Sequence, residues 1–419
     1  MTNSLTMEEL LAEITGLPGG KILFVVLDGL GGLPVPELEG RTELEAAHTP
    51  NMDALAAKSS LGMSNPVLPG VTSGSNSGHL ALFGYDPLQY IVGRGVLEAL
   101  GVGFDLQAED VACRANFATA KRENGKTIIT DRRAGRPTMA EAERLAQKLS
   151  GAVGEIDGIE VFIEPVREHR FVAVFRGEGL SVVDDTDPQR VGAEPLFFTG
   201  QLELPMADRN DAQRMATTVA TFIERATAVL DGEPAANFVL LRGFSKLPNW
   251  PSFEERYGLN AAAVTVYPMY RGLALLVGMM LEEFKGETIN DEITALERIW
   301  DDFDFFFLHF KAPDLHGEDG DCAGKVRAIE EFDKAFPRLI NLKPDVLVVT
   351  GDHSTPSVLK SHSWHPVPFM LHGKHVIPMP DATNFDERRC FRGSLGSFEA
   401  KHAMLLMLAN AGRLGKFSA

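Results

Sequence analysis

Cysteine is scarce in this 419-residue sequence, which contains only Cys113, Cys322 and Cys390 and has no CxxC spacing. The number is odd and the spacing irregular, so the sequence does not have the cysteine pattern of a disulfide framework. We expect the three cysteines to be reduced thiols in a cytoplasmic protein.

Positive charge is also in short supply. The chain has 40 Lys and Arg against 58 Asp and Glu, which gives a formal net charge of −18 at pH 7. Binding to phosphate backbones or anionic lipid requires clustered Lys and Arg, so neither a nucleic acid nor a membrane surface is expected as a partner. A phosphorylated small molecule could bind only where metal ions and a few local arginines overcome this adverse field.

A long uninterrupted apolar run is missing as well. The longest apolar stretch, residues 261–281, is broken by Pro268 and Arg271, so it is not expected to span a membrane. Residues 1–20 are polar and amphipathic, which is not the pattern of a signal peptide. The sequence predicts a soluble protein.

The sequence does contain two apolar, β-branched segments that end at acidic or imidazole side chains. Residues 21–27 lead into Asp28, and residues 346–350 are followed by Asp352 and His353. Open α/β sheets place their ligand sites at the carboxyl ends of the strands. A metal-dependent enzyme is therefore the first hypothesis.

Strand and helix patterns alternate along the chain, which predicts an α/β fold with a doubly wound, mostly parallel sheet. The length favours two or three domains. Between residues 103 and 250 the pattern changes to short alternating segments interleaved with helices, which indicates a smaller inserted α+β domain. We predict a discontinuous main domain over residues 1–102 and 251–419, interrupted by a domain over residues 103–250.

Eight of the eleven histidines lie between His309 and His402, among many acidic residues. Mixed imidazole and carboxylate sets suit Mn²⁺, Zn²⁺ or Mg²⁺. An isolated loop histidine is more often structural than a ligand. The metal hypothesis is stronger here because five candidates all follow strands of the same predicted sheet: Asp28, Asp314, Asp352, His353 and His362.

Ser75 is the candidate nucleophile. It lies in the segment G-S-N-S-G-H, part of an irregular stretch over residues 64–79 that is rich in small residues. A serine hydroxyl needs a base or a metal ion to lower its pKa before it can attack at neutral pH. The alternative, which composition alone favours, is a flexible Ser/Gly linker.

Motifs along nearly the whole chain, in a fixed order, resemble those of one family. They are V-L-D-G-L-G at Asp28, T-P-N-M-D-A-L-A from Thr49, G-S-x-x-G-H-L-A-L-F-G-Y-D-P from Gly74, V-G-R-G-V-L-E-A-L-G from Val92, R-A-N-F-A-T from Arg114, D-R-R-A-G-R from Asp131, L-L-R-G from Leu240, S-F-E-E-R-Y-G-L from Ser252, G-K-V-R-A-I-E-E-F-D from Gly324, T-G-D-H-S-T-P-S from Thr350 and H-S-x-x-P-V-P from His362. The sequence is therefore similar to the archaeal-type, cofactor-independent (2,3-bisphosphoglycerate-independent) phosphoglycerate mutases of the alkaline phosphatase superfamily.

The resemblance implies two divalent metal ions and no organic cofactor. The residues implied for the first ion are Asp28, Ser75, Asp352 and His353. Those implied for the second ion are Asp314, His362 and the residue four positions after Asp314.

That last position differs from the family pattern. The family commonly has histidine there, in D-x-x-G-H-D-G-D, whereas this chain has Glu318. A glutamate oxygen would favour Mn²⁺ or Mg²⁺ over Zn²⁺, with Co²⁺ as a further alternative. His316, two residues away, is the alternative ligand.

The resemblance also implies the reaction. Ser75 would take the phosphoryl group from 3-phosphoglycerate, form a phosphoserine and return the group to the other hydroxyl to give 2-phosphoglycerate, a step of glycolysis and gluconeogenesis. The main domain would be the metal-binding phosphotransferase domain and the inserted domain would bind the substrate. The arginines that could contact its carboxylate or phosphate are Arg133, Arg136 and Arg242 in the inserted domain and Arg94 and Arg271 in the main domain.

Two alternatives stay open from sequence. The same scaffold could act as a metal-dependent phosphatase or as a phosphotransferase on a small metabolite such as homoserine. A non-catalytic metal-binding relative is disfavoured because Ser75, which metal binding alone does not need, is present. The sequence leaves the oligomeric state open.

Overall fold

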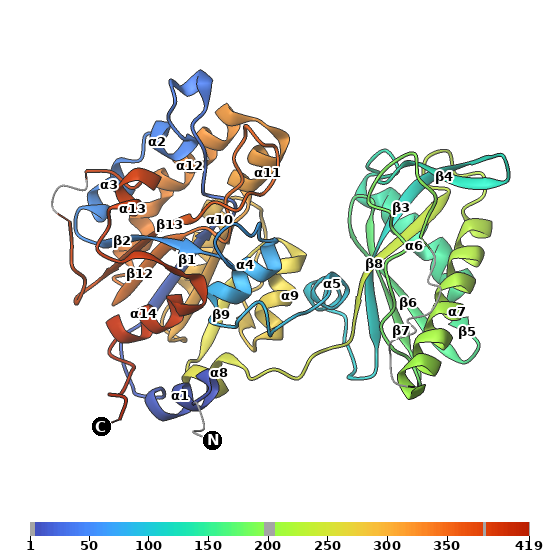
Figure 1. Ribbon diagram of the computed structural model, residues 1–419, viewed down its shortest axis with the longest axis horizontal. Helices are drawn as coiled ribbons and strands as arrows, with labels where there is room; N and C mark the ends of the chain where they lie inside the picture. The colour runs from blue at the N-terminus through green and yellow to red at the C-terminus, as the bar shows by residue number, and fades with distance from the viewer. Residues whose placement is uncertain (1–4, 197–205, 380–382, 419) are drawn as a thin grey trace. The chain divides into compact units, whose positions relative to one another are not determined.

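The computed structural model describes residues 5–196, 206–379 and 383–418, and it divides into two compact units (Figure 1). Unit 1 contains the chain up to Ile91, Pro251–Tyr270 and the chain from Ala274 onward. Unit 2 contains Val92–Trp250 and Arg271–Leu273. The inserted unit therefore begins at Val92, rather than at residue 103 as the sequence suggested.

Within the described residues, unit 1 is built on an eight-stranded sheet. Its strands, in spatial order, are β10 (Met280–Leu281), β9 (Ala261–Val264), β11 (Phe305–Phe310), β1 (Ile22–Leu27), β12 (Val346–Thr350), β13 (Val367–Gly373), β2 (Ser60–Asn65) and β14 (Gly396–Glu399). All neighbouring strands are parallel except where β13 pairs with β12 and β2. The predicted α/β fold with a mostly parallel sheet is confirmed.

The three central strands β11, β1 and β12 are fully buried along their length. Parallel strands covered on both faces are typically continuous apolar runs, which explains the sequences FFFLHF, ILFVVL and VLVVT. Side chains of β1 alternate between the two faces, so Leu23 and Val25 join the core on one side while the ring of Phe24 contacts Phe83 and Phe305 on the other.

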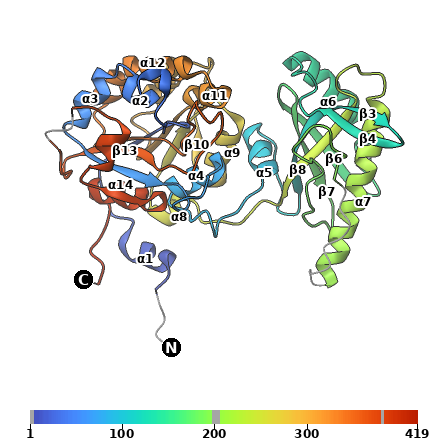
Figure 2. The same cartoon turned by 45° about the horizontal axis from the view of Figure 1, so that its top comes forward.

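Helices cover both faces of this sheet. They are α1 (Met7–Ile14), α2 (Glu43–Ala46), α3 (Pro50–Ala56), α4 (Ser75–Leu82), α8 (Phe253–Tyr257), α9 (Pro268–Leu276), α10 (Ile289–Arg298), α11 (Ala312–Asp319), α12 (Cys322–Asn341), α13 (Glu387–Phe391) and α14 (Ala403–Asn410), with short 3₁₀ turns at η1 (Pro36–Leu38) and η2 (Ala400–His402). Figure 2 shows α2, α3 and α12 on one side and α4 and α14 on the other. Residues 271–273 of α9 group with unit 2.

Unit 2 is an α+β unit with its own antiparallel sheet. The described part of the chain gives it six strands: β3 (Val111–Glu123), β4 (Lys126–Asp131), β5 (Glu155–Ile156), β6 (Ile159–Arg167), β7 (Arg170–Arg176) and β8 (Phe238–Ser245). Its helices are α5 (Arg94–Gly101), α6 (Met139–Val153) and α7 (Met206–Val229). Helices α6 and α7 pack with the sheet in one apolar core, and α5 contacts β3, β7 and β8.

The packing of α5 explains where unit 2 begins. Its buried residues include Val96 and Leu97, and Gly95 lies so close to β3 that a Cβ would be 2.3 Å from the carbonyl oxygen of Ala112. The sequence identified this segment as a motif but could not say which sheet its apolar side would meet. No helix of the described chain is both long enough and apolar enough to cross a bilayer.

Candidate active site

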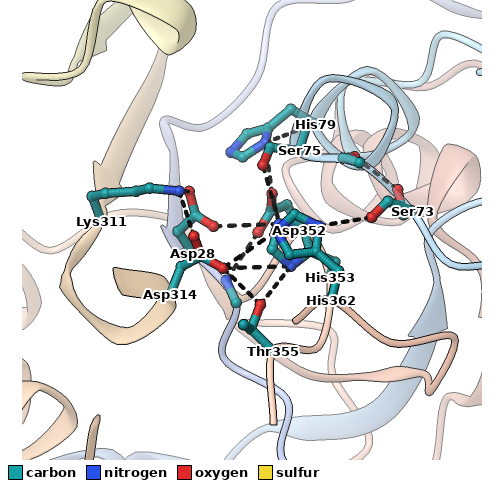
Figure 3. A network of polar contacts seen from close by, with 12 residues as sticks. Asp28, Ser73, Ser75, His79, Lys311, Asp314, Asp352, His353, Thr355 and His362 are labelled. Atoms are coloured by element: carbon teal, nitrogen blue, oxygen red, sulfur yellow. Dashed lines mark hydrogen bonds and ion pairs between the residues drawn. The ribbon is translucent and has the colours of Figure 1, made fainter. Parts of the chain in front are cut away.

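Three neighbouring parallel strands of unit 1 end at one edge of the sheet, and each leads to acidic or imidazole side chains. β1 leads into Asp28, β12 is followed by Asp352 and His353, and β11 leads into α11, which carries Asp314. All four side chains are at most 1% exposed. Figure 3 shows them turned toward one another, so residues that are far apart in the sequence converge at one place.

Asp28, Asp352 and His353 form a first group, with potential ligand atoms that all lie within 4.8 Å of one another. His353 Nε2 lies 3.5 Å from Asp28 Oδ1 and 3.2 Å from Asp352 Oδ2. Both carboxylate oxygens are buried, and neither accepts a hydrogen bond from the described residues. Because a buried carboxylate oxygen without a donor is costly, this arrangement fits a bound cation.

Ser75 lies beside this first group. Its Oγ is 3.1 Å from His353 Nε2, and the residue is only 4% exposed. Ser75 begins α4 and residues 64–65 end β2, so the prediction that residues 64–79 lack regular structure was wrong at both ends. Helix α4 can approach because residue 78 is glycine: a Cβ there would be 2.3 Å from the carbonyl oxygen of Asp352.

Thr355 determines which nitrogen of His353 carries the proton. The Thr355 hydroxyl donates to Asp314 Oδ1 at 2.6 Å and also lies 3.0 Å from His353 Nδ1. A hydroxyl has one proton to donate, so His353 Nδ1–H is the donor in the second contact. The Nε2 lone pair then faces the first group, as metal ligation requires.

A second group contains Asp314 and His362, with His353 at its boundary to the first group. His362 Nε2 lies 3.6 Å from Asp314 Oδ1, and the His353 and His362 rings stack with centroids 3.6 Å apart. His362 Nδ1 lies 3.0 Å from the carbonyl oxygen of Ser73, which positions that nitrogen as a donor. The Nε2 of His362 therefore faces the second group.

Glu318 is adjacent to the second group, although it is not one of the residues whose ligand atoms all lie within 4.8 Å. Its Oε1 is 3.5 Å from His362 Nε2, and its side chain is 53% exposed. His316, the alternative, instead places Nδ1 3.0 Å from Asp321 Oδ2. The geometry favours Glu318 over His316 as a third ligand.

Lys311, which is not among the site residues predicted from sequence, lies between the two groups. Its Nζ donates to Asp28 Oδ2 at 2.9 Å, to Asp314 Oδ2 at 2.7 Å and to the Tyr270 hydroxyl at 2.9 Å. Burial opposes its charge, but Asp28, Tyr270 and Asp314 raise the pKa of Lys311 well above its usual value. Its position in the sequence, directly after β11 and three residues before Asp314, could have indicated that Lys311 belongs to the site.

These charges determine the protonation of the potential ligands. Burial alone would raise the pKa of Asp28, but Lys311, His309 and His353 hold it well below its usual value. Burial lowers the pKa of His353, against the opposing effect of Asp352 and Asp28. For His362 burial is outweighed, mainly by Glu318 and then by Asp314, and the pKa rises to about 9.

Two further buried histidines, also missed from sequence, surround the first group. His79 Nδ1 lies 2.8 Å from the carbonyl oxygen of Ser75 and 3.2 Å from Asp352 Oδ2. His309 Nε2 lies 3.0 Å from Asp28 Oδ2. The motif G-S-x-x-G-H could have indicated His79, whereas His309 lies inside an apolar strand where the pattern gives no sign of a functional side chain.

In unit 2, the buried Arg114 and several half-buried arginines lie close enough for their like charges to repel one another. Burial lowers the pKa of Arg114 to about 9; Glu98 opposes this shift, while Arg170, Arg242 and Arg94 reinforce it. Arg114 Nη1 is 3.2 Å from Glu98 Oε1. The Nε atoms of Arg114, Arg170 and Arg242 are buried without a hydrogen-bond acceptor among the described residues. Such donors fit an anionic ligand.

The remaining predicted arginines lie in unit 2 as well. Burial lowers the pKa of His169 to about 3, and the charges of Arg170, Arg114, Arg133 and Arg136 reinforce the shift. Arg133 and Arg136 are thus near the same cluster.

Arg94 and Arg271 group with unit 2, whereas the sequence analysis placed them in the main domain. Arg271 Nε donates to the carbonyl oxygen of Gly101 at 3.2 Å. Arg114, Arg170 and His169 were missed because charged residues inside a buried strand or at its end are indistinguishable, from one sequence, from exposed ones.

Comparisons with known proteins agree on one family. The family model described as 2,3-bisphosphoglycerate-independent phosphoglycerate mutase matches residues 56–236. The chain is 50% identical over 416 residues to a probable 2,3-bisphosphoglycerate-independent phosphoglycerate mutase of Aquifex aeolicus, covering 98% of this chain and 100% of the relative.

Two solved structures are also similar. One is a protein from Pyrococcus horikoshii, with a TM-score of 0.81, 30% identity and coverage of 96% of this chain and 100% of that one. The other is a cofactor-independent phosphoglycerate mutase from Thermoplasma acidophilum, with a TM-score of 0.66, 30% identity and coverage of 94% and 100%.

Proposed function

The chain belongs to the 2,3-bisphosphoglycerate-independent phosphoglycerate mutase family, and from this premise we propose that Ser75 is the residue that carries the phosphoryl group. The enzyme interconverts 3-phosphoglycerate and 2-phosphoglycerate, so its substrate is a small molecule. The observation that supports Ser75 is the 3.1 Å distance from its Oγ to His353 Nε2, at the edge of a buried set of carboxylates.

We propose that Asp28, Ser75, Asp352 and His353 hold one divalent ion. Asp314, His362 and Glu318 would hold the second. The donor sets are carboxylate, hydroxyl and imidazole without sulfur, which suits Mn²⁺ or Mg²⁺, with Co²⁺ or Zn²⁺ as alternatives. When bound, such ions lower the pKa of a serine hydroxyl and neutralise phosphoryl oxygens.

The Ser75 oxygen would attack phosphorus, and the bond from phosphorus to one glycerate oxygen would break. The proton lost by Ser75 would be balanced by the proton gained by that glycerate oxygen. In the return step the other glycerate hydroxyl attacks the phosphoserine, and Ser75 Oγ leaves and regains a proton. Because every phosphoryl transfer is between oxygens of substrate and Ser75, water must be kept out.

We propose that the arginine cluster of unit 2 binds the anionic groups of the substrate. This cluster consists of the arginines whose charges shift the pKa of Arg114 or of His169, together with Arg114 itself: Arg94, Arg114, Arg133, Arg136, Arg170 and Arg242. Guanidinium groups bind carboxylate and phosphate in a bidentate manner, which would hold the glycerate between the two transfers. Arg271 is kept as a supporting residue because it contacts the end of α5.

The test is an assay with 3-phosphoglycerate and Mn²⁺, without added bisphosphoglycerate. We expect 2-phosphoglycerate without release of inorganic phosphate. Release of phosphate, or transfer to another acceptor such as homoserine, would instead support the phosphatase or the phosphotransferase alternative.

Ser75→Ala tests the nucleophile, and Ser77→Ala is the matched control in the same helical turn. Ser77 Oγ donates to the carbonyl oxygen of Gly74. We expect Ser75→Ala to lower kcat by about 10⁴-fold or more and Ser77→Ala to keep most of the activity. Substantial turnover by Ser75→Ala would refute its role.

We also propose that the enzyme acts in the cytoplasm. Its substrate is a glycolytic intermediate, and Cys113, Cys322 and Cys390 are free thiols, two of them buried.

A further inference from the structure

Lys325, on helix α12, is a buried cation outside the candidate ligand set. It is 0% exposed, and its Nζ donates three hydrogen bonds, all to backbone carbonyl oxygens. The acceptors are Gly29 at 2.8 Å, Gly31 at 3.0 Å and Thr355 at 2.8 Å. An ammonium group has three protons, so its hydrogen-bonding capacity is used completely.

The three acceptors belong to the two loops that carry potential metal ligands. Gly29 and Gly31 lie one and three residues after Asp28, and Thr355 is two residues after His353. The loops also contact each other, because Thr355 N–H donates to the carbonyl oxygen of Gly31 at 3.1 Å. Lys325 therefore joins the loop after β1 to the loop after β12.

Residues of both loops form direct hydrogen bonds with the candidate ligand side chains. Gly29 N–H donates to Asp352 Oδ1 at 3.1 Å. The Thr355 hydroxyl contacts Asp314 Oδ1 at 2.6 Å and His353 Nδ1 at 3.0 Å. A shift of the loop after β1 would thus move ligands of the first group, and a shift of the loop after β12 would move ligands of both groups.

Two buried carboxylates contact the N–H groups of the same loops. Glu387 Oε1 accepts from Gly32 N–H at 2.9 Å. Glu43 Oε1 accepts from Ser357 N–H at 2.9 Å. The lysine thus binds carbonyls of both loops and each glutamate binds an N–H of one loop.

From this arrangement we propose that Lys325 is a positioning residue for the metal site. It holds the loops that follow Asp28 and His353 in the positions in which the side chains of these two residues bind divalent ions. This inference rests on the proposed metal site. The hydrogen bonds of Lys325 go to loop carbonyls and not to the ligand side chains, so it acts through the loops.

If Lys325 only filled space in the core, a charged side chain would not be needed at this position. A buried ammonium is costly, and an apolar side chain of similar length would fill the same space without that cost. Burial lowers the pKa of Lys325, while Glu43 and Glu387 oppose the shift and so support the charged form. The three backbone carbonyls that Lys325 aligns explain why a charged side chain is present at position 325.

The experiment compares Lys325→Met with the natural protein, both stripped of metal. Mn²⁺ binding is measured by electron paramagnetic resonance and by calorimetry, and activity is measured across a series of Mn²⁺ concentrations. We expect the Mn²⁺ Kd to rise by about 10- to 100-fold, as for other residues that orient metal ligands. High Mn²⁺ should restore most of kcat, which a general loss of structure would not allow.

Asp333→Asn is the matched control. Asp333 lies on the same helix, is 1% exposed and accepts from Met52 N–H at 2.8 Å, so it fixes the start of α3 and not a metal loop. We expect this variant to melt at a lower temperature with an unchanged Mn²⁺ Kd. If Lys325→Met also melts lower with an unchanged Kd, the inference is overturned.

Thr355→Val provides a second variant if Lys325→Met fails to fold. It keeps the carbonyl that Lys325 binds and removes the hydroxyl that touches Asp314 and His353, so a natural Mn²⁺ Kd in this variant would also overturn the inference. The two proposals fail differently. Absence of Mn²⁺ binding by the natural protein refutes the metal site itself, whereas equal binding by the natural protein and Lys325→Met refutes only the role of Lys325.

Discussion

Glu387 makes the stability of unit 1 depend on pH in a direction that can be worked out. It is 7% exposed, accepts from Gly32 N–H at 2.9 Å and from the Thr42 hydroxyl at 2.7 Å, and burial raises its pKa from 4.5 to about 7. Between these two values the folded protein keeps a proton that the unfolded chain has released. The contribution of Glu387 to stability is therefore fully present below pH 4.5 and is lost as the pH rises through 7.

The magnitude follows from the shift. A difference of 7 − 4.5 = 2.5 pKa units, at about 1.4 kcal/mol per unit, corresponds to about 3 kcal/mol of unfolding free energy. Glu387→Gln keeps an acceptor for Gly32 but has no proton to exchange. We expect the difference in unfolding free energy between the natural protein and Glu387→Gln to change by about 3 kcal/mol between pH 4 and pH 8, with the variant gaining relative stability at high pH.

Urea unfolding of the metal-free proteins, followed by the fluorescence of Trp300 and Trp364 in unit 1, measures this difference. Glu255→Gln is the control, because hydrogen bonds from the Ser252 backbone and side chain lower the pKa of this exposed glutamate. Its difference from the natural protein should have the opposite sign with pH. A difference for Glu387→Gln that stays within about 1 kcal/mol over this pH range would refute the reasoning.

Two more predictions concern the ligands. Glu318→His should shift metal preference toward Zn²⁺ relative to Mn²⁺, because imidazole is the softer donor, and competition binding of the two ions to metal-free protein measures it; an unchanged preference would show that Glu318 is not a ligand. Arg242→Met should raise KM for 3-phosphoglycerate by about 10- to 100-fold, the size of a charge-assisted hydrogen bond, as steady-state kinetics would show; an unchanged KM would remove Arg242 from the substrate site.

Sequence was sufficient where one physical rule dominates. The segments that form β1 and β12 are apolar throughout because both faces of a parallel strand are buried, and the position directly after such a strand is where ligand side chains gather. Asp28, Asp352 and His353 could be found in this way. Asp314 lies inside α11, and its link to the same edge came from the strand that precedes it.

Sequence was insufficient where tertiary packing decides. The amphipathic pattern of residues 94–101 gives the apolar side of α5 but not its partner, which is the sheet of unit 2. From sequence alone, the side chains of Lys311 and Lys325 would be predicted to be exposed to solvent. They are buried because backbone carbonyls or carboxylates from distant loops surround them, and no local pattern records that.

Charge in the two units is unbalanced in opposite directions. In unit 1 the single ammonium of Lys311 contacts Asp28 and Asp314, while Asp352 Oδ2 is left without a hydrogen-bond donor among the described residues. In unit 2 the repulsion between Arg114 and its neighbouring arginines is opposed by Glu98. We propose that the excess of buried carboxylate in unit 1 selects for cations and that the guanidinium groups of unit 2 select for an anion. A chain with a net charge of −18 can therefore bind a phosphorylated carboxylic acid, because local charge at short range outweighs a net charge that solvent screens.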